Sequence, residues 1–168
     1  MFNDPEWASP EEWDAYAWFG FAVSEAQAVE SELLVIATAL SSRRESGKHF
    51  DATWAMNFSK LAHLPLGKLL GQVRRHQVVP DDMVQLLEEA VKRRNYLAHE
   101  FFWPHCRGAD RELSAEEAKK RFMEDASLFR GLATRLEAVM WATLDELHIK
   151  REDIAAQAAR ALSSIDQP

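Results

Sequence analysis

Residues 9–43 read SPEEWDAYAWFGFAVSEAQAVESELLVIATALSSR, and this stretch decides the fold. Ser9, Pro10 and Glu12 give a helix start signal: a serine cap, a proline at the first helical position and a glutamate three residues after the cap. Apolar residues then recur at alternating steps of four and three, which places them on one helical face; they are Ala15, Phe19, Ala22, Ala26, Val29, Leu33, Ile36 and Leu40. We therefore expect a long amphipathic helix from about residue 10 to about residue 43.

A second long helix is predicted near the other end of the chain. Ser114 and Glu117 repeat the capping signal, and we expect the helix to run to about His148. Its apolar face consists of Ala115, Ala118, Phe122, Ala126, Phe129, Ala133, Leu136, Met140, Thr143 and Leu147. The two long helices are similar in length, which favours a helical bundle.

Shorter helices are predicted between them. The run 51–58 suits a short helix that places Trp54 and Phe58 against the bundle. Pro65 suits the first turn of a helix that ends in cations at residues 74–76. Pro80 opens a third helix, which Trp103 and Pro104 stop. Its apolar stripe, which Arg94 interrupts, is Met83, Leu87, Ala90, Arg94, Leu97 and Phe101.

These elements predict an all-α fold: a bundle of four to five helices with long first and fourth helices. No run alternates with period two for long enough to make a strand, and no linker separates two domains. We expect a single helical domain over residues 1–168, with residues 1–9 as a flexible N-terminus and residues 153–168 as a short C-terminal helix and tail.

Composition bounds the class of protein. The chain has 168 residues and 19.2 kDa, and its charge is 20 − 27 = −7, which argues against nonspecific coating of nucleic acid or anionic lipid. The single cysteine, Cys106, excludes an internal disulfide and fits a reducing compartment. We see no secretion signal and no apolar run long enough to span a membrane, so we expect a cytoplasmic location.

The residues that carry chemistry lie in the run KRRNYLAHEFF, at positions 92–102. Asn95 and His99 are one helical turn apart, so the amide can orient the imidazole. Arg94 and His99 are five positions apart, which separates them by about 140° around an ideal α-helix. They are poor partners within one straight helix, but a two-fold dimer axis would bring two copies of each into one cleft.

The segment from Arg94 to Phe101, including the Arg-x4-His spacing from Arg94 to His99 and the asparagine Asn95 after the arginine, resembles the signature of the HEPN superfamily. Many members carry an aromatic residue two positions after the histidine, where Phe101 stands; the toxin branch often has tyrosine there. HEPN domains are helical bundles and commonly homodimers, and the predicted helix order agrees with that architecture. The bundle predicted here is therefore HEPN-like.

This resemblance implies metal-independent endoribonuclease activity at a dimer interface, without a cofactor. His99 would serve as general acid or base, Arg94 would stabilise the charge on phosphorus, and Asn95 would support the phosphate. Apart from the resemblance, Lys92 and Arg93 are candidates for binding RNA phosphates through local positive charge, with solvated charge at a helix end as the alternative, and Phe101 is a further candidate for RNA binding. The implied setting is a toxin-antitoxin or antiviral defence system, in which an antitoxin or regulatory protein restrains the enzyme. His105 and Cys106 lack the spacing of a metal site.

Other interpretations stay open from sequence alone. The chain can be a helical dimerisation module, or a module that binds RNA or a nucleotide without cleaving it. It can also be a purely structural bundle, in which Arg94 pairs with an acidic residue of the first long helix and His99 interacts with a helix dipole; the acidic candidates are Glu25, Glu30 and Glu32.

Overall fold

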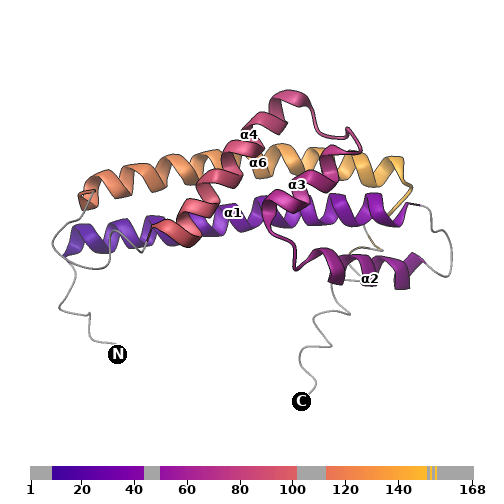
Figure 1. The fold of residues 1–168 in the computed structure, drawn as a ribbon, viewed down its shortest axis with the longest axis horizontal. Coiled ribbons are helices and arrows are strands. Elements are labelled where there is room, and N and C mark those ends of the chain that lie inside the picture. The colour runs from indigo at the N-terminus through magenta and orange to yellow at the C-terminus, as the bar shows by residue number, and fades with distance from the viewer. Residues whose placement is uncertain (1–8, 44–49, 102–112, 151, 153, 155–168) are drawn as a thin grey trace, which may run out of the picture. The chain divides into compact units, whose positions relative to one another are not determined.

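The computed structural model describes residues 9–43, 50–101, 113–150, 152 and 154, and over these residues it is all-helical without strands (Figure 1). The elements are α1 (Pro10–Ser42), α2 (Phe50–Leu61), α3 (Leu66–Arg74), α4 (Asp81–Asn95), the π-helical turn η2 (Tyr96–Glu100) and α6 (Ala115–Glu146). The all-α prediction is confirmed, and α1 and α6 are the two long helices. Of the predicted flexible N-terminus, residues 1–9, residues 1–8 lie outside the described residues and Ser9 caps α1. Of the predicted C-terminal segment, residues 153–168, all but residue 154 lie outside the described residues.

The described chain divides into two compact units, each built from both long helices. Unit 1 comprises Met1–Val29 and Asp82–Thr134, and unit 2 comprises Glu30–Asp81 and Arg135–Pro168. The expectation of a single domain stays a prediction. No helix among the described residues is long and apolar enough to cross a membrane.

Both long helices begin with the reciprocal hydrogen bonds that the sequence predicted. The Ser9 amide donates to the Glu12 carboxylate at 2.7 Å, and the Glu12 amide donates to the Ser9 hydroxyl at 3.3 Å. At the start of α6, the Ser114 amide donates to Glu117 at 2.8 Å, and the Glu117 amide donates to the Ser114 hydroxyl at 3.3 Å. Each of these reciprocal pairs, known as a capping box, provides acceptors for backbone amides that a helix start otherwise leaves without partners.

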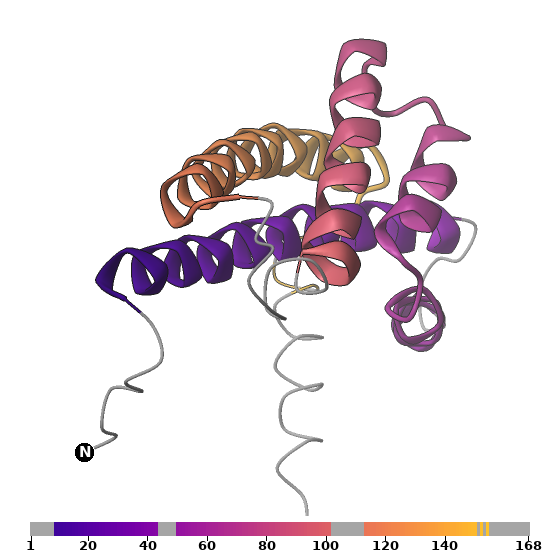
Figure 2. The ribbon, with the colours of Figure 1, turned by 60° about the vertical axis from the view of Figure 1, so that its left-hand side comes forward.

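In unit 1, α1 and α6 run parallel, because residues at a constant offset of 105 pair along them. Lys119 donates to Asp14 at 3.0 Å and Arg130 donates to Glu25 at 2.8 Å. Figure 2 shows α4 and η2 passing across these two helices. The apolar core of the unit consists of Ala15, Ala22, Ala26, Val29, Met83, Val84, Leu87, Ala90, Leu97, Phe101, Ala118, Phe122, Ala126, Phe129 and Leu132.

In unit 2, α2 and α3 complete the core. Helix α3 buries the four apolar residues that the sequence predicted, Leu66, Leu69, Leu70 and Val73. Helix α2 buries Trp54, at 4% exposure, but leaves Phe58 38% exposed. Of the two aromatic residues predicted to pack against the bundle, only Trp54 is therefore in the core. The Asn57 amide donates to the Ser42 hydroxyl at 3.0 Å, which ties α2 to the end of α1.

The pair Glu32 and Glu137 is an unfavourable feature of unit 2. One carboxylate oxygen of Glu32 is buried without a hydrogen-bond partner among the described residues. Burial raises the pKa of Glu32 above its ordinary value of 4.5, and the neighbouring charge of Glu137 raises it further. Both effects disfavour the ionised form.

The charge on Glu32 should therefore destabilise the folded chain at neutral pH. Because the folded state holds this proton more tightly than the unfolded state does, the contribution of Glu32 to stability falls as pH rises from about 4.5 toward 7. We expect Glu32→Gln to raise the free energy of unfolding at pH 7 by on the order of 1 kcal/mol, and to have little effect near pH 4. Chemical denaturation at both pH values measures this.

Glu137→Gln is the matched variant. Glu137→Gln removes the smaller of the two causes of the raised Glu32 pKa, the charge of Glu137. It should therefore raise the free energy of unfolding at pH 7 by less than Glu32→Gln does. Equal stability of Glu32→Gln and wild type at pH 7 would contradict this account.

Candidate functional site

The segment from α4 through η2 to Phe101 presents three different faces. The predicted core stripe is buried at Met83, Leu87, Ala90, Leu97 and Phe101, with Arg94 partly buried on the same stripe. A second face turns toward α6 and carries Glu89, Arg93 and Tyr96. A third face is exposed and carries Lys92, Asn95 and His99.

The predicted motif lies where α4 becomes the π-helical turn η2. The amide of Phe101 donates to the carbonyl of Tyr96 at 2.9 Å, a bond that spans five residues instead of the four of an α-helix. Each residue of this wider turn rotates the chain by less than 100°. A turn of this kind is expected to place His99 less than 140° around the axis from Arg94, but the two side chains differ in exposure: Arg94 is partly buried on the core stripe and His99 is exposed.

Residues of α6 hold both ends of η2. The guanidinium of Arg121 lies over the ring of Tyr96, with its central carbon 3.9 Å from the ring centroid. The ring of Phe101 packs edge-on against Phe122 at 4.7 Å and stacks on Phe19 of α1 at 5.1 Å. Side-chain packing therefore fixes Tyr96 and Phe101, the two residues that the i to i+5 hydrogen bond joins.

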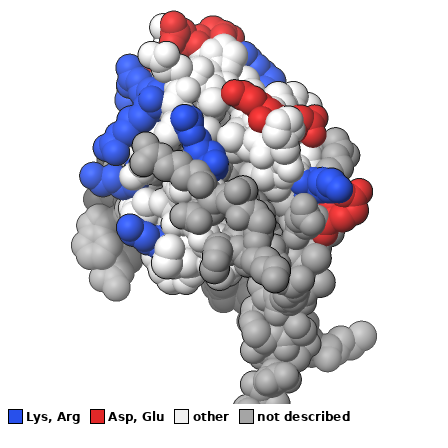
Figure 3. Space-filling model, turned by 90° about the vertical axis from the view of Figure 1, so that its right-hand side faces the viewer, with Lys and Arg blue, Asp and Glu red and all other residues white. Residues whose placement is uncertain are grey.

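Asn95 and His99 are both exposed and lie four residues apart in the chain; that the Asn95 amide orients the His99 imidazole stays a prediction. Lys92 is exposed one turn before Asn95. Figure 3 views the molecule from the right-hand side of Figure 1, and on that face several Lys and Arg side chains lie along one edge although the chain has a net charge of −7.

Arg93 does not join that exposed face. Its Nη1 donates to Oδ1 of Asp125 at 2.8 Å and its Nε donates to Oε1 of Glu89 at 2.9 Å. These hydrogen bonds raise the pKa of Arg93, with Asp125 the larger cause and Glu89 the smaller. Arg93 thus links α4 to α6, and two of its five donors are engaged within the protein.

Asp125 is the one charged residue among the buried residues that the structure describes, at 1% exposure. Burial raises its pKa, and the hydrogen bond from Arg93 opposes that rise without cancelling it. Its Oδ2 has no hydrogen-bond partner among the described residues. The sequence interpretation missed this residue, although an acid between Phe122 and Ala126 on an apolar stripe is a signal that could have found it.

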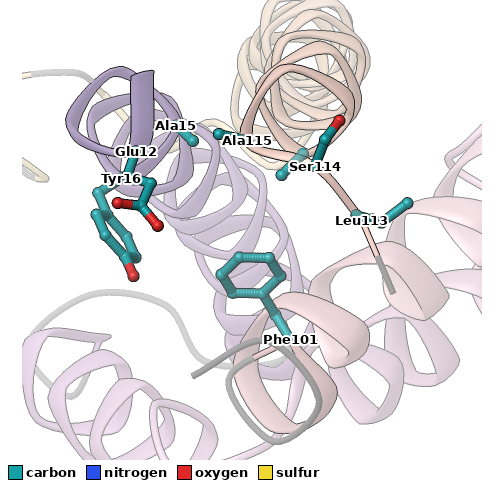
Figure 4. Close-up of a pocket in the computed structure, with 8 residues that line it drawn as sticks. Glu12, Ala15, Tyr16, Phe101, Leu113, Ser114 and Ala115 are labelled. Atoms are coloured by element: carbon teal, nitrogen blue, oxygen red, sulfur yellow. The ribbon is translucent and has the colours of Figure 1, made fainter. Parts of the chain in front are cut away.

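Phe101 was predicted to bind RNA, but the residue is only 4% exposed and its ring packs on Phe19 and Phe122. It is therefore not available to stack on a base in this chain. Figure 4 shows Phe101 beside Glu12 and Tyr16 of α1 at a pocket of about 40 Å³. Such a space suits water rather than a nucleotide.

A larger hollow of about 440 Å³ lies on the face between α4 and α6. Its lining alternates in charge and comprises Glu89, Arg93, Leu113, Glu117, Lys120, Arg121, Glu124 and Asp125. No group of three histidine, cysteine or acidic side chains within the described ranges is arranged to hold a metal ion; His105 and Cys106 lie outside those ranges.

The chain was compared with known proteins. No family model, no curated protein and no solved structure matches it.

The ion pair of Arg93 with Asp125 should be important for stability. Arg93→Ala leaves a buried carboxylate without its cation, and we expect a loss of about 2 to 3 kcal/mol in the free energy of unfolding. This is below the cost for a fully buried pair because the Arg93 side chain is 34% exposed. Urea denaturation measures the loss.

Two further variants make this test specific. Lys92→Ala, on the exposed face of the same helix, should change stability by less than about 0.5 kcal/mol. Arg93→Met combined with Asp125→Leu removes both charges and should recover most of the loss. Full stability of Arg93→Ala alone would refute a structural role for the pair.

Proposed function

We propose that this protein is a metal-independent endoribonuclease that acts as a homodimer, with His99, Arg94 and Asn95 as its catalytic residues. The observation that carries the proposal is the exposure of His99 and Asn95 on one face, in a π-helical turn that is expected to reduce the angle between His99 and Arg94. Such turns occur frequently at functional sites. The resemblance of this segment to the HEPN signature supports the same assignment.

The proposed reaction is attack of a ribose 2′-oxygen on the adjacent phosphorus. The P–O5′ bond breaks, and the products are a 2′,3′-cyclic phosphate and a 5′-hydroxyl. One base must take the 2′-hydroxyl proton and one acid must give a proton to the leaving oxygen. An imidazole titrates near neutral pH and suits either role, while the planar donors of Arg94 suit the charged phosphorane.

The need for both an acid and a base supports the homodimer. One chain offers one His99, whereas a two-fold interface through the exposed face of α4 would supply two. Asn95 and Lys92, on the same face, would then contact the phosphate backbone of RNA.

The first test is incubation of the purified protein with a mixed RNA pool in the presence of a chelator. Wild type should cleave RNA and leave 2′,3′-cyclic phosphate ends. His99→Ala and Arg94→Ala should each lower the rate by at least about a hundredfold, the usual scale for an acid-base or charge-stabilising group.

His63→Ala and Arg75→Ala are the matched controls, because both residues are exposed but belong to unit 2. They should cleave at the wild-type rate. Each variant is checked for fold by circular dichroism and for a solution mass of twice the 19.2 kDa chain. Binding of RNA without cleavage by wild type would favour a non-catalytic RNA-binding module.

A second test addresses the proposed setting in a defence or toxin-antitoxin system. Induced expression in a bacterial host should arrest growth if the enzyme acts on cellular RNA. His99→Ala should abolish the arrest, and His63→Ala should preserve it. Growth curves at matched protein levels measure this. Equal toxicity of His99→Ala and His63→Ala would show that the growth arrest does not depend on His99.

A further inference from the structure

The hollow between α4 and α6 differs in charge from a phosphate site. Four carboxylates line it, from Glu89, Glu117, Glu124 and Asp125, against three cations. A phosphate there would meet net repulsion, because sites for phosphate oxygens are formed by Arg, Lys and backbone amides. The lining suits a neutral polar group that can donate hydrogen bonds.

One wall of the hollow is a stacking surface. Arg121 is exposed and lines the hollow, and the central carbon of its guanidinium lies 3.9 Å from the centroid of the Tyr96 ring. Nucleic-acid bases stack on the planes of arginine guanidinium groups as well as on aromatic rings. Leu113 adds an apolar contact to the lining.

The carboxylates that line the hollow differ in how many of their oxygens already accept a hydrogen bond within the protein. Arg93 engages one oxygen of Glu89 and one of Asp125, and Ser114 engages Glu117. Glu124 is exposed and makes no hydrogen bond or ion pair with the side chains that the structure describes. Its two oxygens can accept a pair of adjacent N–H donors.

We infer that this hollow binds a guanine base of the RNA, stacked on Arg121 and hydrogen-bonded through its N1–H and N2–H groups to Glu124. Among the four common bases, guanine alone places two donors side by side on its Watson–Crick edge. The inference rests on the proposed function for its RNA substrate. Because Tyr96 begins the turn that contains His99, the bound base would lie within about one helical turn of the proposed catalytic face.

Nucleoside binding tests the site without requiring cleavage. Guanosine, inosine, adenosine, cytidine and uridine are titrated into the full-length protein, and affinity is measured by NMR chemical-shift changes. Guanosine should bind most tightly. Inosine, which lacks the N2 amino group, should bind more weakly by about tenfold, the usual discrimination for one lost hydrogen bond to a charged acceptor.

Three variants locate the binding. Arg121→Ala and Glu124→Gln should each weaken guanosine binding by about tenfold or more. Arg130→Ala is the matched control, because Arg130 is also an exposed arginine of α6 over an aromatic ring, that of Phe21 at 4.8 Å, but does not line the hollow. It should bind guanosine as wild type does.

The outcomes separate this inference from the proposed function. Guanosine binding by a wild-type protein that cleaves no RNA upholds the base site and refutes the nuclease. RNA cleavage at all bases alike, with no guanosine binding, refutes the base site and leaves the nuclease. Equal losses in Arg121→Ala and Arg130→Ala would also overturn the base site.

Discussion

The ion pair between Arg93 and the buried Asp125 is the constraint on which the geometry of unit 1 depends. A carboxylate with 1% exposure loses nearly all of its hydration, and its cost is offset only while the guanidinium stays at 2.8 Å. Rotation of α4, or sliding of α4 along α6, would break this contact. The pair therefore sets which residues of α4 face α6, which enter the core and which face solvent.

The π-helical turn follows in the chain directly after this fixed point. Its two ends are held by α6: Tyr96 lies beneath Arg121, and Phe101 lies against Phe122. A turn that is anchored at both ends cannot relax to α-helical geometry without breaking one contact. His99 lies between the two anchors and is exposed, so its position is set by packing on the opposite side of the same turn.

Much of the fold could be predicted from the sequence because its signals are local. Serine caps and apolar spacing act within one helix, so the bounds of α1, α3 and α6 followed from the residues themselves. The π-helical turn could not be predicted, because a periodicity of 100° per residue assumes a regular α-helix, and the π-helical turn departs from that geometry. The roles of Arg93 and Phe101 depended on Asp125 and Phe19, which lie far away in the sequence and meet them only in the folded chain.

The net charge of −7 limits how the proposed enzyme would recognise RNA. Long-range attraction of the phosphate backbone would be weak, because the field of the whole protein opposes it. In the proposed enzyme, selectivity for RNA would then have to come from short-range contacts, and the proposed stacking on Arg121 with hydrogen bonds to Glu124 is of that kind. In the proposed enzyme one face of α4 would carry out the chemistry, while the face toward α6 would select the base. The Arg93–Asp125 pair would keep the two faces in fixed relation.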